Sequence, residues 1–306
     1  MQIYLPIADL PVNIFLVLGM GLAVGFISGM FGIGGGFLMT PLLIFIGIPP
    51  AVSVASVASH IAASSFTGAL NYWRRRAIDI ALALMLLSAG IVGTATGVWL
   101  FTLLRTLDQL DLVIGLSYVT LLTVVGGLMI NEGLRAVLRA RHGMPAMLRR
   151  PGSHNWLHGL PLKMRFKRSK IYVSAIPVWG IGFIIGFVGA IMGIGGGFLL
   201  VPMLIYFLRV PTATVIGTSM VLTLITMASA TVLHAATNHL VDAILALTLM
   251  VGGVVGAQFG AHTGQKMRPE RLRLLLGLLV FAVGVRFAYD LVVPPDDLYS
   301  LRVVRP

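Results

Sequence analysis

The chain has 306 residues, of which 58% are hydrophobic and 10% charged, and its mean hydropathy of +0.97 lies far above that of a soluble domain. Cysteine is absent, which excludes disulfides, thiolate catalysis and cysteine-based metal sites. The formal net charge is +12, and ten of the 22 Lys and Arg lie between residues 135 and 170. In a membrane protein this bias is typical of an orientation signal and of contact with anionic lipids, and it argues against nucleic-acid binding.

Long apolar runs predict membrane-spanning helices, because about 20 apolar residues are needed to cross about 30 Å of hydrocarbon. Polar and apolar residues do not alternate in them, which argues against a β-barrel. The first run lacks a basic flank and a cleavage site, so we expect a retained helix and not a signal peptide. The runs cover residues 12–31, 81–104, 112–130, 171–192, 241–261 and 272–293.

Two of the apolar stretches are interrupted in the same way by glycine. Residues 29–41 read GMFGIGGGFLMTP, and residues 190–202 read AIMGIGGGFLLVP. Such a density of glycine removes most of the helical preference, so each stretch predicts a break in a membrane helix. The apolar segments that follow, at residues 37–48 and 198–208, rise only about 16 Å as helices and are half the length of a span.

The two glycine stretches belong to an internal repeat with a spacing of 161 residues. Pro41 pairs with Pro202 at this spacing, and Asp79 pairs with Asp242 after a drift of two residues. We predict four segments: an N-terminal membrane repeat at 1–131, a basic cytoplasmic linker at 132–170, a C-terminal membrane repeat at 171–293, and a short tail at 294–306.

The positive charges favour one of two orientations for the repeats. If the linker is cytoplasmic, the triple arginine of Arg74, Arg75 and Arg76 is cytoplasmic too, and a there-and-back hairpin at each break leaves both termini outside. The alternative, in which each broken pair crosses once, gives parallel repeats and exports the basic cluster at 266–273. We predict an all-α polytopic membrane protein of two inverted repeats, each a glycine-broken re-entrant hairpin plus three transmembrane helices.

The breaks predict a binding site for an anion. Non-helical backbone at membrane depth is tolerated where it lines a cavity or is buried in protein, and helix starts carry free amides and partial positive charge. Discontinuous helices in matching positions of inverted repeats indicate a transporter's substrate site. The glycines could instead serve only close helix packing, which is the interpretation we adopt for Gly93 with Gly97 and for Gly256 with Gly260.

Polar side chains flank the breaks and extend the candidate site. Ser56, Ser59, Thr218 and Ser219 are expected to add hydroxyl donors, although such groups also bond to carbonyls of their own helix. His60 is a candidate for handling protons or the anion. Asp79 and Asp242 are expected to cap helices. The predicted site residues are Gly32, Gly34, Gly35, Gly36, Phe37, Ser56, Ser59, His60, Gly193, Gly195, Gly196, Gly197, Phe198, Thr218, Ser219 and Gln258.

The doubled pattern of a glycine break, Phe-Leu and a proline, followed by a helix with Gly217, Thr218 and Ser219, resembles the TauE/SafE sulfite-exporter family of permeases. The resemblance covers nearly the whole chain. It implies transport of a small, often sulfur-containing anion such as sulfite, a sulfonate or sulfoacetate, driven by an ion gradient. The first half departs from the family's Thr-Ser pair by carrying Ala58 and Ser59, which leaves the choice of anion open.

The sequence is also compatible with two other functions. An intramembrane hydrolase could pair Ser59 or Ser219 with His60 or His234, although no GxSxG or HExxH motif is present. An anion channel could use the same breaks. We expect a non-enzymatic permease of the cell inner membrane without cofactor or metal, with a small anion, a coupling ion such as the proton and anionic lipids as partners, and with homo-oligomers possible.

Overall fold

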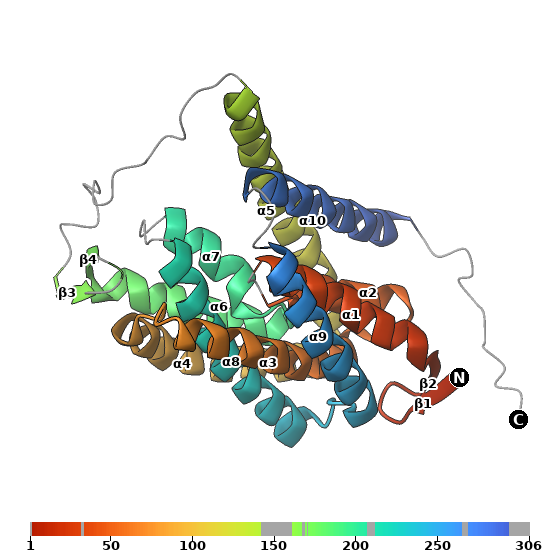
Figure 1. The fold of residues 1–306 in the computed structure, drawn as a ribbon. Coiled ribbons are helices and arrows are strands. Elements are labelled where there is room, and N and C mark those ends of the chain that lie inside the picture. Colours follow the sequence, from red (N-terminus) through yellow and green to blue (C-terminus); the bar gives the residue numbers. More distant parts are fainter. Residues whose placement is uncertain are drawn as a thin grey trace, which may run out of the picture. The chain divides into compact units, whose positions relative to one another are not determined.

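The computed structural model describes residues 2–31, 34–141, 161–166, 169, 171–206, 212–264 and 269–293. Within these ranges seven helices are long and apolar enough to cross a membrane, which confirms a helical multi-pass membrane protein (Figure 1). They are α1 (Ile14–Phe31), α4 (Ile80–Thr106), α5 (Leu110–Arg141), α6 (Ala175–Met192), α8 (Thr212–Leu233) with η2 (His234–Asn238), α9 (Ala243–Gly264) and α10 (Pro269–Val292).

Three further helices complete the described chain. The short apolar segments that follow the glycine breaks form α2 (Gly36–Phe45) and α7 (Gly196–Tyr206), of ten and eleven residues. Helix α3 (Pro50–Arg74) is long but carries several serines, among them Ser56 and Ser59, and it is not among the seven apolar spans. The half-length helices are therefore where the sequence predicted them.

Two β-hairpins were not expected from the sequence. Strand β1 (Gln2–Leu5) pairs with β2 (Leu10–Asn13), and β3 (Lys163–Phe166) pairs with β4 (Ile171–Ser174), both antiparallel. The helices after them consequently begin later than the apolar runs, because hydropathy does not distinguish a strand entering a helix from the helix itself. Helix α5 also runs on to Arg141, past the start expected for the basic linker.

The chain divides into two compact units. Unit 2 comprises residues 112–146 and 269–306, and its described part is the helix pair α5 and α10. Tyr118 stacks on Phe287 with ring centroids 5.4 Å apart. A Cβ on Gly126 would lie 2.8 Å from the amide nitrogen of Phe281, so this glycine lets the two backbones approach. Unit 1 holds all the other helices and both hairpins.

Glycines also bring helices of unit 1 together in two matching pairs. A Cβ on Gly93 of α4 would overlap the carbonyl oxygen of Phe183 in α6. A Cβ on Gly256 of α9 would overlap the carbonyl oxygen of Leu22 in α1. The packing interpretation of these glycines is confirmed, because in each pair a side chain of any size would force the backbones apart.

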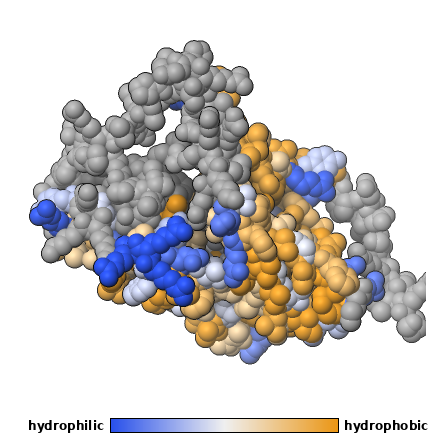
Figure 2. Space-filling model, in the orientation of Figure 1, coloured by the Kyte–Doolittle hydropathy of each residue, from blue (hydrophilic) through white to orange (hydrophobic). Residues whose placement is uncertain are grey.

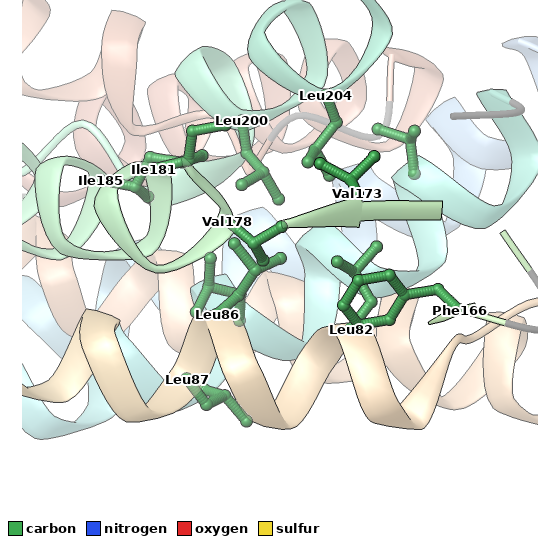
Figure 3. Close-up of a cluster of buried hydrophobic side chains, with 12 residues drawn as sticks. Leu82, Leu86, Leu87, Phe166, Val173, Val178, Ile181, Ile185, Leu200 and Leu204 are labelled. Carbon is green, nitrogen blue, oxygen red and sulfur yellow. The ribbon is translucent and has the colours of Figure 1, made fainter. Parts of the chain in front are cut away.

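The apolar residues of unit 1 divide between an interior cluster and the exterior. Figure 3 shows the cluster, in which Leu82 and Leu86 of α4 meet Val178 of α6, Leu200 of α7 and Phe166 of β3. Many large apolar side chains are nevertheless exposed, and Figure 2 shows hydrophobic surface over much of the described chain. A lipid environment accounts for this exterior, since a soluble protein rarely exposes so large an apolar area.

Two buried aspartates join the halves of the chain. Asp79 caps α4 by accepting from the Leu82 amide at 3.3 Å, and Asp242 caps α9 by accepting from the Leu245 amide at 3.1 Å, as predicted. The second oxygen of Asp79 accepts from the Ser169 amide at 2.9 Å, and that of Asp242 from the Ile7 amide at 3.0 Å. Each aspartate thus binds the hairpin region of the other half.

Candidate functional site

The two glycine breaks meet inside unit 1. Phe37 of α2 stacks on Phe198 of α7 with ring centroids 4.5 Å apart and an interplanar angle of 13°, and both rings are buried. The hydroxyl of Thr40 donates to the carbonyl oxygen of Gly193 at 3.3 Å. Residues 161 positions apart in the sequence therefore form one cluster, as the repeat predicted; Gly32 lies outside the described residues.

The backbone of the breaks requires glycine. Gly34 and Gly35 have φ values of +94° and +68°, and Gly193 and Gly195 have +62° and +78°. Residues other than glycine are strained in this left-handed region of backbone conformation. Gly36 is constrained by space instead, because a Cβ there would lie 2.6 Å from the carbonyl oxygen of Gly193.

The second break is equally crowded. A Cβ on Gly196 would lie 2.7 Å from Cγ2 of Ile185, and Gly197 is buried in the first turn of α7. At the start of α2 two amides already have partners: the Gly36 amide donates to Gly34 at 2.9 Å, and the Leu38 amide donates to Gly35 at 3.2 Å. Helix α2 therefore keeps fewer free amides for a ligand than the sequence suggested.

Two side chains that sequence reasoning did not select lie against both breaks. Cγ2 of Ile61 in α3 and Cγ2 of Thr223 in α8 are each 3.5 Å from the position of a Cβ on Gly34. They lie 2.9 Å and 3.4 Å from the same position on Gly195. Ile61 and Thr223 are 162 residues apart, and the spacing between matching repeat positions runs from 161 to 163 residues. The repeat could therefore have identified them as a matching pair.

The predicted hydroxyl donors are buried and have partners within the protein. Ser56 accepts a hydrogen bond from the Asp242 amide at 3.0 Å, and Thr218 accepts one from the Asp79 amide at 3.3 Å. The Ser59 hydroxyl donates to the carbonyl oxygen of Ser56 at 2.6 Å, and Ser219 donates to Ile216 at 2.8 Å. These four residues lie on α3 and α8 as expected, where they connect or stabilise the helices.

His60 is fully buried on α3 and faces α9. Its Nδ1 lies 2.7 Å from the carbonyl oxygen of Leu249, so this nitrogen carries the proton that the carbonyl accepts. The ring lies where a Cβ on Gly253 would be. Gln258, further along the same helix, is exposed and lines a cavity.

This cavity has a volume of about 380 Å³ and lies where the ends of α1, α3 and α9 meet the start of α8. Its lining residues include Ser64 and Tyr72 of α3, Arg75 just after α3, and Gln258 and His262 of α9. Arg75 is the only lysine or arginine that lines it within the described residues, and no described carboxylate does. The charge of the lining therefore suits an anion.

The cavity reaches the first break through Ser28 of α1. Ser28 lines the cavity, and its Cβ lies 2.9 Å from the position of a Cβ on Gly35. Ser64, which also lines the cavity, lies one turn of α3 beyond Ile61. A solute in the cavity is thus separated from the glycine backbone by little more than one side chain.

A polar cluster lies around η2, at repeat positions that correspond to those of the cavity. His234 is bound on both ring nitrogens: Nε2 lies 3.1 Å from the carbonyl oxygen of Ala190, and Nδ1 lies 3.2 Å from the side-chain nitrogen of Asn238. Thr102 donates to the side-chain oxygen of Asn238 at 3.0 Å, and the His234 ring packs edge-on against Phe101. These contacts connect α4, η2 and the end of α6.

Comparison with known proteins places these features in a family. The family described as "Sulfite exporter TauE/SafE" matches residues 17–287. A probable membrane transporter protein of Xylella fastidiosa (strain 9a5c) is 30% identical over 283 residues, which cover 89% of this chain and 94% of that protein. The probable membrane transporter protein YjnA of Bacillus subtilis is 25% identical over 87% of this chain and 96% of its own length.

A plant protein shares a shorter stretch. The sulfite exporter TauE/SafE family protein 1 of Arabidopsis thaliana is 45% identical over 53 residues, which are 17% of this chain and 12% of that protein. No solved structure matches the chain.

Proposed function

We propose, from the premise that this chain belongs to the TauE/SafE family of membrane transporters, that it is a secondary transporter for a small sulfur-containing anion such as sulfite, a sulfonate or sulfoacetate. The substrate site is the region between the two glycine breaks. The hydrolase considered from the sequence is set aside, because the family consists of transporters and because Ser59 and Ser219 donate to backbone carbonyls.

The observation that carries the proposal is the contact between the breaks. The Phe37 and Phe198 rings stack, and four glycines around them adopt positive φ. Irregular backbone at membrane depth is costly unless it is buried or serves a ligand, and matching broken helices are a mark of transporter sites. The start of α7 and the remaining free amides of α2 bring partial positive charge toward this point, which favours an anion.

The other predicted residues take supporting roles in this proposal. Ser56, Ser59, Thr218 and Ser219 hold α3 and α8 in position next to the breaks. His60 joins α3 to α9 through its Nδ1 proton and the Leu249 carbonyl, and its Nε2 has no partner among the described residues. Gln258 lines the route by which the anion approaches.

The cavity supports the inverted arrangement of the repeats. Arg75 at the end of α3 and His262 near the end of α9 line the same cavity of about 380 Å³. Because both line one cavity, the end of α3 lies beside the end of α9, which supports the two helices ending at the same membrane face. Parallel repeats require the two ends to lie at opposite faces.

Contacts around Asn238 support the same arrangement from the other face. The Arg105 guanidinium, at the end of α4, donates to the carbonyl oxygen of Asn238 at 3.0 Å. The Ile7 amide, in the N-terminal hairpin, donates to Asp242 at the start of α9. The inverted arrangement assigns all four of these residues to the outer face, and the basic residues at the cavity to the cytoplasm.

Alternating access follows from the difference between these two ends. One end holds an open cavity that approaches the breaks, and the other is closed by the His234 and Asn238 cluster. One repeat moves against the other, so that the open end closes and the closed end opens while the site stays in place. This movement carries the anion across the membrane.

A flux assay with the purified protein in proteoliposomes tests the function. We expect uptake of at least one of sulfite, sulfonates and sulfoacetate, with dependence on an imposed pH gradient and little uptake of carboxylates. Single cysteines at Arg76 and His239, available because the chain has none, test the topology. The two sites are expected to be labelled from opposite faces, and labelling from one face contradicts the inverted repeats.

A further inference from the structure

Three buried polar atoms have no hydrogen-bond partner within the part of the chain that the structure describes. They are Nε2 of His60, the hydroxyl of Ser65 and the hydroxyl of Thr223. Ser65 is 0% exposed and Thr223 is 1% exposed, so water does not satisfy them at the surface. Buried hydroxyls almost always have partners, and each exception calls for an explanation.

Each of the two hydroxyls lies beside one of the glycine breaks. The Ser65 oxygen is 3.8 Å from the position of a Cβ on Gly34, and the Thr223 oxygen is 3.1 Å from that position on Gly196. The methyl group of Thr223 faces Gly34 and Gly195 at the same time. The space left by the missing side chain of Gly34 is thus bordered by both residues.

Neighbouring hydroxyls on the same helices behave differently. Thr226, one turn after Thr223, donates to the carbonyl oxygen of Leu222 at 2.8 Å. Ser64, beside Ser65, donates to the carbonyl oxygen of Ile61 at 3.1 Å. Serine and threonine in apolar helices commonly bond to their own helix in this way. The missing bonds at Ser65 and Thr223 are therefore a local feature of the breaks and not a general property of α3 and α8.

We propose that the hydroxyls of Ser65 and Thr223 donate to oxygens of the transported anion while it lies between the breaks. The ligand class is a small oxyanion with several acceptor oxygens, such as sulfite or the head group of a sulfonate. The inference rests on the proposed function and specifies which side chains contact the substrate. It replaces Ser59 and Ser219, whose hydroxyl protons already bond to carbonyls.

The cavity comes close to these hydroxyls, although neither Ser65 nor Thr223 lines it. Ser64 lines the cavity and Ser65 is the next residue of α3. Ser28 borders both the cavity and Gly35. An anion that moves from the cavity past Ser28 therefore comes to the space beside Gly34 that Ser65 and Thr223 border.

The test compares Thr223→Val and Ser65→Ala with matched controls. Thr226→Val and Ser53→Ala remove buried hydroxyls of α8 and α3 that already donate to backbone carbonyls. Uptake of sulfite and of methanesulfonate into proteoliposomes gives KM and the maximal rate for each variant, and thermal unfolding in detergent gives its midpoint. Thr223→Ser retains the hydroxyl and serves as the rescue.

We expect KM to rise roughly tenfold or more in Thr223→Val and Ser65→Ala, because each loses a hydrogen bond to a charged ligand. The controls and Thr223→Ser are expected to stay within about twofold of the wild-type KM. The midpoints of Thr223→Val and Ser65→Ala should not fall, since neither substitution leaves a partner unsatisfied. A purely structural role predicts the opposite pattern, with lower midpoints and unchanged KM.

The outcomes separate this inference from the proposed function. If the wild-type protein takes up these anions and both variants keep its KM, the assignment of the hydroxyls is overturned while the function stands. A lower midpoint that accompanies an unchanged KM overturns it as well. If the wild-type protein takes up no anion, the proposed function fails and this inference fails with it.

Discussion

The two ends of unit 1 are built from matching residues and yet differ in what they enclose. At one end Tyr72 of α3 and Gly29 of α1 line the cavity of about 380 Å³. At the other end the residues at the corresponding repeat positions are His234 and Ala190, which are joined by a hydrogen bond of 3.1 Å. Asn238 and Thr102 extend this bond into a closed cluster.

The two ends have a similar framework and different contents. At each end an aspartate that caps a helix, Asp79 or Asp242, is hydrogen-bonded to the hairpin region of the other half. The two ends therefore share the same backbone arrangement at this point. The side chains between the helices differ. The proposed alternating access requires one open and one closed end in each conformation, and the cavity and the His234 cluster are the candidates for these two ends. The predictions below test how far this comparison holds.

The largest expected effect comes from the breaks, which serve both ends. Gly35→Val places a branched side chain at φ +68° and within 2.9 Å of the Cβ of Ser28, so the start of α2 must move. Transport is expected to fall to background, whichever end faces the substrate. Proteoliposome flux measures the loss, and size-exclusion profiles in detergent check that the protein still inserts and folds.

Gly19→Val is the matched control for this prediction. Gly19 lies on α1 with no atom within 4 Å of its Cβ position, so the same substitution meets open space. We expect it to keep most of the wild-type flux. Normal flux in Gly35→Val would mean that the breaks serve only helix packing. The two ends would then not share a substrate site at the breaks.

Much of this architecture could be predicted from the sequence. The spacing of 161 residues identified the matching breaks, and half-length apolar segments identified α2 and α7. The caps at Asp79 and Asp242 were also predicted, because a carboxylate before an apolar run suits free helix amides. These features are local or periodic, and a sequence displays both.

The contacts between the halves could not be predicted in the same way. Ser56 and Thr218 were expected to face a substrate, but each accepts a bond from an aspartate amide of the opposite half. Thr223 was one threonine among several on its helix, and only the packing of α8 against both breaks distinguishes it. Partner choice for a hydroxyl depends on which helices meet, which one sequence without its relatives does not display.

The second prediction concerns the closed end, where Asn238 bonds to its neighbours. Asn238→Leu removes the bonds to Thr102 and His234, and it should weaken the closed end by about 1–2 kcal/mol. A cysteine at Val98, which is 3% exposed in α4 one turn before Thr102, reports the opening. Its labelling by an impermeant thiol reagent is expected to rise about tenfold in the Asn238→Leu background.

A cysteine at Ala261 reports the other end. Ala261 lines the cavity at the repeat position that corresponds to Val98, so its labelling should fall as that of Val98 rises. Thr231→Val is the control, because the Thr231 hydroxyl bonds only to the carbonyl of Met227 among the described contacts. If both cysteines become more reactive together, the ends are not alternating and the cluster is an ordinary packing element.

The smallest expected effect concerns the charge at the open end. Arg75 is exposed and is the only described lysine or arginine in the cavity lining, so it attracts an anion without enclosing it. Arg75→Gln is expected to raise KM about two- to threefold at about 0.05 M salt and to leave the maximal rate unchanged. The difference should vanish near about 0.5 M salt, because an exposed charge is screened over a few ångströms there.

Arg74→Gln, at the neighbouring exposed arginine that does not line the cavity, controls for the loss of net charge. If the two substitutions raise KM equally, the general positive potential of this face attracts the anion and the cavity has no specific part in it. If Arg75→Gln instead lowers the maximal rate at every salt concentration, Arg75 contacts the anion during translocation. The open end would then contain part of the binding site, and the two ends would differ in chemistry as well as in state.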